Sequence, residues 1–440
     1  MNKNNGFKAF LIIWLGQLIS SIGSGLTSFG LNIYVFKQTQ SVLACSIVTL
    51  CAFLPMVLLT PFSGVLADKF SRKNLMLIGD SFSAICLLVL LLIIITKNDN
   101  VTLICICVFC SAIFSSLMDP AYKSTLTDLL TVDQFSKAGG LIQLASAAKF
   151  LISPIIAGII IKFGGINTIL LIDICTFFFT LFSVVVAGKQ MKKSQQLNKD
   201  SKLDFFKDFV EGWKSLTQNH GVVVLMFLST LITFYIGMIE TLLTPMLLEL
   251  TDSSTLGVIT SVSAIGMLAT SILLGVKGIR NGYVRLLSIG FAIMGCMIGV
   301  VGCVTNLVMI AVLGFLFFAM IPVINTCIDV LLRSNLDNET QGREWGLISF
   351  VTQIGYIFAY GISGVLADYV FNPMLRSEGS LANSVGKIVG TGSERGIAFM
   401  MIICGLSMIV LSIIIYRNKT MKAVENAYVA HLSDLAQDAG

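Results

Sequence analysis

Charge is scarce in this sequence. Only 12% of its 440 residues are charged, whereas soluble proteins carry about 25%, and 55% are hydrophobic, with a mean hydropathy of +0.89. So few charges leave most of a surface of this size uncovered in water, which excludes a soluble enzyme. The net charge of +5 is small for so long a chain and gives no sign of nucleic-acid binding.

Histidine is rare as well, and there are no cysteines in polar loops and no nucleotide-binding motifs. Only His220 and His431 occur, so neither a histidine-based metal site nor a catalytic triad can be assembled. There is no Walker A motif, which argues against ATP as an energy source. All 11 cysteines lie in apolar runs, and the one CxxC pair, Cys107 and Cys110, is interpreted as apolar filler. We therefore expect no metal and no cofactor.

What the sequence has in abundance is apolar runs of about 17–25 residues or more, the length that spans a bilayer. They fall at about 8–36, 42–67, 74–96, 101–120, 138–163, 166–188, 222–249, 255–276, 284–304, 306–332, 344–371 and 396–416. The predicted fold class is an all-α membrane protein with twelve transmembrane helices. The run that begins at Phe10 is too long for a cleavable signal peptide.

Lysine and arginine are distributed unevenly between the connections. With a cytoplasmic N-terminus, 22 of the 29 fall on inside segments, Lys149 lies within a span, and six lie outside. The outside residues are Lys37, Lys97, Lys162, Arg376, Lys387 and Arg395. This bias predicts a multi-pass protein of the cell membrane with both termini in the cytoplasm.

The longest inside connection divides six spans from six. The predicted domains are an N-terminal bundle at 1–188, a cytoplasmic linker at 189–221, a C-terminal bundle at 222–417 and a cytoplasmic tail at 418–440. Apolar residues recur at helical spacing in the second part of the linker. They predict an amphipathic helix that lies on the inner membrane face or packs on the spans.

The two halves repeat one another at a constant offset. Gly-Leu-Ile occurs at 140–142 and again at 346–348, and the same offset relates Gly158 to Gly364. Two six-helix halves that share a cavity are typical of secondary transporters. The repeat therefore predicts two pseudo-symmetric bundles and alternating access.

Several motifs carry a family likeness. Residues 64–73, Gly-Val-Leu-Ala-Asp-Lys-Phe-Ser-Arg-Lys, lie between spans 2 and 3 and resemble the signature of the major facilitator superfamily. Pro154 and Gly158 in span 5 resemble a loose form of that family's antiporter motif. Residues 364–368 and 211–213 resemble its macrolide-efflux and siderophore-exporter branch. The resemblance covers nearly the whole chain and implies a bacterial transporter rather than an enzyme.

The signature loop is expected to form a conformational latch. Asp68 and Arg72 can form a charge-assisted pair at the cytoplasmic rim, with Gly64 and Lys73 in the same motif. Asp368 is expected to play a related role at the outer rim. The alternative is a topology signal that only keeps the loop inside.

Each charge within a span needs a reason, because it costs at least about 2.5–3.5 kcal/mol on insertion scales. Glu240 in span 7 is the leading candidate for proton coupling, since a desolvated carboxylate takes up and releases protons near neutral pH. Asp173 and Asp80 are further candidates. We expect Asp173 to be structural, and Asp80 to pair with Arg72 or Lys73.

Polar faces on spans 1, 5 and 7 predict a water-filled substrate cavity. Its candidate residues are Gln17, Ser21, Asn32, Gln143, Lys149, Thr233, Gly237 and Glu240. For the hydroxyl groups the alternative is a bond to their own helix backbone. Lys149 either balances a membrane acid or meets an anionic group on the substrate.

Together these features predict a monomeric secondary transporter. The resemblance implies export of bulky, amphipathic, drug-like compounds, of macrolide type, by proton antiport driven by the proton gradient. The expected partners are a small amphipathic substrate, protons and the lipid bilayer, and no nucleic acid. The alternatives are export of an endogenous siderophore or lipid-like metabolite, and a non-transporting membrane sensor or scaffold on the same fold.

Overall fold

The structure of the chain is a computed structural model that describes residues 3–69, 71–98, 100–187, 205–279, 281–333, 335–336, 341–392 and 395–426. All regular elements within these ranges are helical. They are α1 (Lys3–Thr39), α2 (Val42–Lys69), α3 (Arg72–Ile95), α4 (Val101–Leu129), α5 (Val132–Phe163), α6 (Gly165–Ala187), α7 (Phe205–Gln218), α8 (His220–Leu250), α9 (Ser253–Lys277), α10 (Tyr283–Val301), α11 (Leu307–Arg333), α12 (Gln341–Val365), a π-helix (Leu366–Phe371), α13 (Asn372–Met374), α14 (Gly386–Val389) and α15 (Arg395–Arg417).

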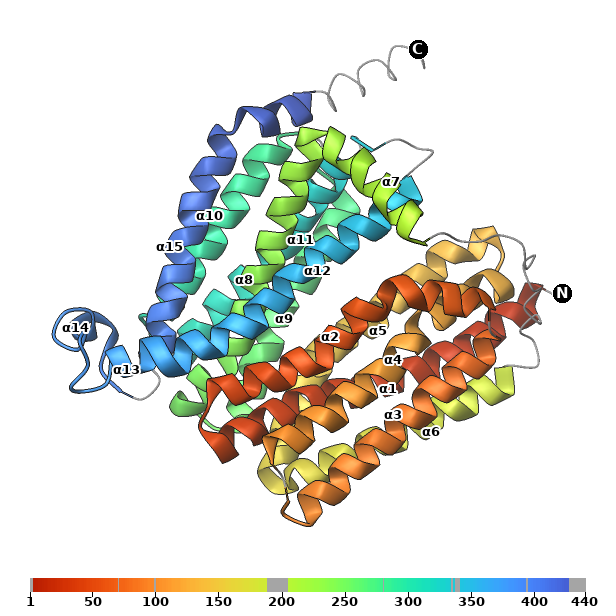
Figure 1. The fold of residues 1–440 in the computed structure, drawn as a ribbon, viewed down its shortest axis with the longest axis horizontal. Coiled ribbons are helices and arrows are strands. Elements are labelled where there is room, and N and C mark those ends of the chain that lie inside the picture. Colours follow the sequence, from red (N-terminus) through yellow and green to blue (C-terminus); the bar gives the residue numbers. More distant parts are fainter. Residues whose placement is uncertain are drawn as a thin grey trace. The chain divides into compact units, whose positions relative to one another are not determined.

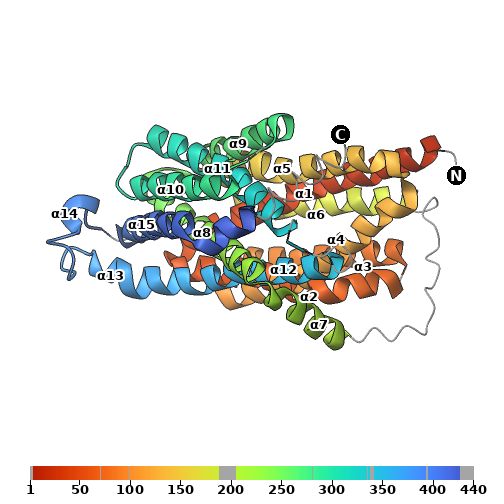
Figure 2. The ribbon, with the colours of Figure 1, turned by 90° about the horizontal axis from the view of Figure 1, so that it is seen from above.

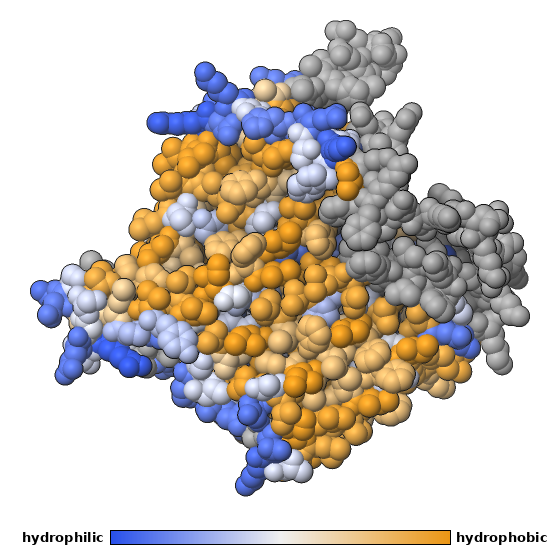
Figure 3. Space-filling model, in the orientation of Figure 1, coloured by the Kyte–Doolittle hydropathy of each residue, from blue (hydrophilic) through white to orange (hydrophobic). Residues whose placement is uncertain are grey.

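Twelve helices of the described ranges are long and apolar enough to cross a membrane, which confirms the predicted fold class. Several extend beyond the apolar runs: α4 continues to Leu129, and α5 already begins at Val132. In Figure 3 hydrophobic side chains cover the flanks of the helices, and hydrophilic ones gather at their ends. This distribution is what a lipid-facing surface requires.

Helix packing divides the chain into two compact units (Figure 1). Unit 1 comprises Met1–Lys202 together with Thr251–Ser261, and unit 2 comprises Leu203–Leu250 and Val262–Gly440. The first turns of α9 thus pack with α1–α6, although the sequence places them in the C-terminal bundle. Helix α7 lies within the predicted linker and packs against α8 and α12.

In unit 1 the central seam joins α1 to α6 and depends on glycine. Gly16, Gly23 and Gly30 recur every seven residues on α1 and face α6. A Cβ atom at any of them would collide with α6 side chains, among them Thr176 and Ile169. Small residues let helix backbones approach closely in a membrane, where packing rather than the hydrophobic effect holds helices together.

The matching seam in unit 2 joins α10 to α15, which run side by side in Figure 2. Ser288 and Ser412 each donate to the other's carbonyl oxygen at 2.8 Å. Further along, a Cβ atom on Gly405 would lie 2.5 Å from the Gly295 carbonyl oxygen and 2.7 Å from the Gly299 nitrogen. The seam therefore combines hydroxyl bonds with direct backbone contact.

Replacement of Gly405 by alanine should loosen this seam. The added Cβ meets backbone atoms of α10, which cannot rotate away, so we expect a destabilisation of about 1–3 kcal/mol, as for other overpacked sites. Thermal unfolding in detergent measures the effect. The control is Gly361→Ala in α12, where a Cβ would meet nothing within 4 Å. Equal melting temperatures for the two variants would contradict the packing.

Candidate functional site

Unit 1 holds a carboxylate, that of Asp173 on α6, which is only 1% exposed. The Thr176 hydroxyl lies 3.4 Å from Asp173 Oδ1, and the hydroxyls of Thr27 and Ser24 face it from α1. This approach is possible because α1 carries Gly23 opposite the carboxylate, where a Cβ would collide with Asp173 Oδ1. The structure thus surrounds Asp173 with hydroxyl groups from two helices.

Lys149 of α5 lies close enough to act electrostatically on Asp173. Its side chain packs on α1 at Gly25, where an added Cβ would come within 2.9 Å of Lys149 Cγ. The next turn of α5 is tied to α1 as well, since Ser153 donates to the Ile22 carbonyl oxygen at 3.0 Å. Of the two roles open for Lys149, this geometry favours balancing a membrane acid.

Asp80 on α3 is placed differently from the expectation. It is 2% exposed, and its Oδ2 has no hydrogen-bond partner among the described residues. Arg72 donates instead to the Ser124 carbonyl oxygen at 2.6 Å. The expected pairing of Asp80 with Arg72 or Lys73 is therefore wrong, because the Arg72 side chain reaches across to α4.

The remaining polar candidates of unit 1 do not form one cluster. Gln17 is buried, with its Nε2 atom unpaired among the described residues, while Gln143 is exposed and Ser21 is half-buried. Asn32 donates to the Ser28 carbonyl oxygen at 3.1 Å and accepts from Thr49 at 3.2 Å, which ties α1 to α2. Their role in a cavity stays a prediction.

Unit 2 holds the second carboxylate, that of Glu240 on α8. It is exposed, and Tyr360 of α12 donates a hydrogen bond to its Oε2 at 2.7 Å. The Tyr356 ring lies beside the Tyr360 ring, with centroids 5.8 Å apart. Glu240 lies about 7.5 Å along the axis from the midpoint of α8, within the span. The arrangement presents a carboxylate beside two aromatic rings.

The other polar residues of the same α8 face pack against α12. Thr233 donates to the Thr352 carbonyl oxygen at 2.5 Å, and Gly237 faces Ala359 and Tyr356 so closely that a Cβ would not fit. The structure therefore uses Thr233 and Gly237 to bring α12 close to α8. Their membership in the substrate cavity stays a prediction.

Tyr356 and Tyr360 were missed by sequence reasoning, because tyrosine carries no charge and its presence in a span needs no special explanation. The available signal was their four-residue spacing, which places two phenol rings on one helix face. That spacing does not say which helix they meet.

Two residues of the predicted latch, Gly64 and Asp68, lie on α2. The structure describes the helical backbone at these positions but not the surroundings of the side chains. Lys73 is half-buried on α3. Asp368 lies in the π-helix that continues α12, a type of distortion frequent at functional sites. The latch itself stays a prediction.

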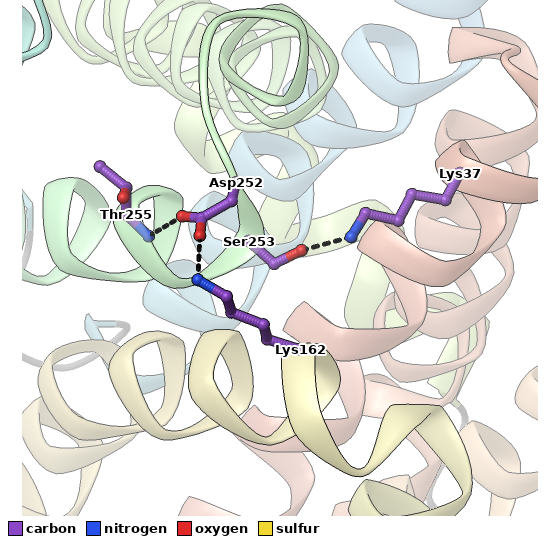
Figure 4. A network of polar contacts seen from close by, with 5 residues as sticks. All are labelled: Lys37, Lys162, Asp252, Ser253 and Thr255. Carbon is purple, nitrogen blue, oxygen red and sulfur yellow. Dashed lines mark hydrogen bonds and ion pairs between the residues drawn. The ribbon is translucent and has the colours of Figure 1, made fainter.

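A polar network, here called the α9 clasp, joins Lys37, Lys162, Asp252 and Ser253 at the end of unit 1 where α5 ends (Figure 4). Lys162 of α5 forms an ion pair with Asp252 at 2.5 Å, and Lys37 of α1 donates to Ser253 Oγ at 2.6 Å. Asp252 also accepts from the Thr255 amide at 2.9 Å and so caps α9. The Lys162 ammonium and the bonds from Thr255 hold the pKa of Asp252 well below its usual range.

The span-5 motif, Pro154 and Gly158, lies where α5 crosses the start of α9, next to the α9 clasp. A Cβ on Gly158 would collide with the Ser253 carbonyl oxygen, and one on Gly257 would collide with the Pro154 carbonyl oxygen. Both helices must therefore lack a side chain at this crossing. This reciprocal contact explains why α9 begins against α5.

The twelve long apolar helices and their hydrophobic flanks define a multi-pass membrane protein. The family model for the Major Facilitator Superfamily matches residues 13–251, more than half of the chain, and the chain belongs to that family. This confirms the resemblance seen in its motifs.

Individual relatives point to one branch of the family. The chain is 25% identical to macrolide efflux protein A of Streptococcus pyogenes over 84% of this chain and 92% of that protein. It is 26% identical to the staphyloferrin A transporter of Staphylococcus aureus over 48% of this chain and 51% of that protein. Among solved structures, a bacterial homologue of the lysosomal transporter Spinster superposes with a TM-score of 0.74 at 12% identity, covering 98% of this chain and 99% of that one.

The α9 clasp yields a prediction about pH. Because the pKa of Asp252 is lowered, the pair is fully formed above the ordinary aspartate pKa and is lost only as the pH falls through the lowered value. Hydrogen–deuterium exchange of residues 253–261, corrected for intrinsic rates, should therefore be equal between pH 5 and 8. Asp252→Asn keeps the cap but removes the charge, so exchange should rise there.

The matched variant is Lys162→Met, which removes the other charge. Combined with Asp252→Asn it should add little, because either change alone breaks the pair. Fully additive effects, or protection that falls between pH 7 and 5 in the unaltered protein, would contradict the clasp.

Proposed function

We propose that this transporter exports amphipathic, drug-like compounds, of macrolide type, in exchange for protons, and that Glu240 is the proton-coupling carboxylate. The proposal is supported by the similarity to macrolide efflux protein A and by the position of Glu240 within a span. The single observation that carries it is the 2.7 Å hydrogen bond from Tyr360 to an otherwise exposed carboxylate.

The exposure of Glu240 has physical consequences. A carboxylate turned toward lipid would carry a large insertion penalty, so the exposed face of Glu240 is expected to meet water or cargo. The Tyr360 hydroxyl fixes one carboxylate oxygen. Such a group can hold a proton or the positive charge of a cargo molecule, but not both at once.

The rings beside Glu240 indicate which cargo would suit the site. Tyr356 and Tyr360 supply aromatic surface next to a negative charge. A cationic amphiphile gains from both, through ion pairing and through contact of the cation with a tyrosine ring. Release of the cargo and uptake of a proton would then be one exchange at one carboxylate, which is what antiport requires.

A second candidate is the export of an endogenous siderophore or lipid-like metabolite. It is supported by the similarity to the staphyloferrin A transporter over about half of each chain. An anionic cargo would be met by Lys149 rather than by Glu240. A sensor or scaffold without transport is the remaining alternative, and it predicts no movement of any compound under any gradient.

Replacement of Glu240 by glutamine should abolish exchange driven by a pH gradient. Glutamine keeps the shape and can still meet Tyr360, but it cannot take up a proton. Uptake of a radiolabelled macrolide into inverted vesicles with an imposed pH gradient measures the effect, and we expect a loss of at least about tenfold. The control is Glu249→Gln, the same change on the same helix at an exposed position near its end. Gradient-driven uptake that survives in Glu240→Gln would overturn the assignment.

Replacement of Tyr360 by phenylalanine tests the hydrogen bond itself. Loss of the donor destabilises the ionised carboxylate, so Glu240 should release its proton less readily and the pH profile of uptake should move to higher pH. The matched control is Tyr235→Phe on α8, which removes a hydroxyl bond to Ser407 Oγ. A profile that shifts equally in both variants, or in neither, would show that Tyr360 does not tune Glu240.

A further inference from the structure

An open cavity of about 530 Å³ lies at the end of unit 1 where α1 and α3 end and α6 begins. This is the end that the lysine and arginine bias predicts to face outward. Its lining includes Lys37, Ile94, Lys97, Ile161, Ile166 and Asn167. The proposed exchange at Glu240 in unit 2 makes no use of it.

The polar part of the cavity is positively charged. Lys97 has no ion pair or side-chain hydrogen bond among the described residues, and Lys37 uses one of its three donors on Ser253. Helix α6 begins at Gly165 in the lining, so its N-terminal amides add partial positive charge. Among the described residues of the lining there is no acidic side chain. Together these groups favour an anion.

The backbone of Lys97 ends α3 and places this side chain at the rim of the cavity. Its φ angle is 55°, in the left-handed region, directly after the C-terminus of α3. Glycine is the usual residue at such a position because a side chain is strained there. The Lys97 amide donates to the Ile94 carbonyl oxygen at 3.1 Å and the Asn98 amide to the Ile93 carbonyl oxygen at 3.2 Å, so this conformation terminates α3.

The rest of the lining is apolar. Ile94, Ile161 and Ile166 come from three different helices and form a hydrophobic wall beside the two ammonium groups. Asn167 also lines the cavity. A ligand that matches these features has a negative head and a hydrocarbon tail.

We propose that this cavity binds the phosphate head of an anionic membrane lipid, with an acyl chain against the isoleucines. The ends of membrane-spanning helices lie at the depth of lipid headgroups, where such a molecule is present at high local concentration. Lys97 and Lys37 contact the phosphate. The site does not depend on the direction of transport or on the coupling ion.

Native mass spectrometry of the purified full chain, titrated with phosphatidylglycerol or with phosphatidylcholine, tests the proposal. We expect selective retention of phosphatidylglycerol, weakened about tenfold in Lys97→Gly through the loss of one charge-assisted contact, and kept in Lys97→Arg. The control is Lys387→Gly, which removes a charge from an exposed lysine of α14 in unit 2.

The melting temperature distinguishes a loss of lipid binding from a loss of folding stability. Lys97→Gly relieves the left-handed backbone, so its melting temperature without lipid should stay equal or rise while lipid binding falls. Equal affinity for the two lipids, or phosphatidylglycerol binding that Lys97→Gly leaves unchanged, would overturn the site. Binding of inorganic phosphate with the same dependence on Lys97, together with no lipid preference, would show a soluble-anion site and overturn the lipid assignment.

Discussion

A hydrocarbon environment offers no hydrogen bonds, so a polar group within the spans is stabilised when it finds a partner inside the protein. The two helix seams follow from this constraint. The glycine row of α1 brings α6 close enough for Thr180 to donate to the Gly16 carbonyl oxygen at 3.2 Å, and Ser288 and Ser412 bond across the α10–α15 seam. Close contact between helix backbones therefore brings the hydroxyl groups within reach of carbonyl oxygens on the neighbouring helix.

The same constraint distinguishes the two carboxylates. Asp173 is buried among hydroxyls with Lys149 nearby. Glu240 has one tyrosine hydroxyl and an exposed face. A carboxylate that is exposed within a span is the better placed of the two to meet a proton or a cargo cation. The contrast is the basis for assigning coupling to unit 2 and a structural role to Asp173.

Much of the fold could be predicted from the sequence, because span length and the distribution of lysine and arginine are local properties of the chain. Twelve spans follow from apolar runs, and Glu240 was singled out by its rarity in a span. What could not be predicted depends on contacts between distant segments. Nothing local shows that Gly158 meets Ser253, so the packing of the first turns of α9 against α5 was not predicted. Tyr360 was missed for the same reason, and Thr233 and Gly237 lie on the predicted polar face but serve packing with α12.

The central claim is that one carboxylate exchanges a proton for cargo. Calorimetric titration of the purified protein with a macrolide, repeated in buffers of different ionisation enthalpy, measures the protons released on binding. The account predicts release of up to one proton per bound macrolide near neutral pH, abolished in Glu240→Gln. Macrolide binding with the same heat in every buffer would show that no proton leaves, and would contradict antiport at this site.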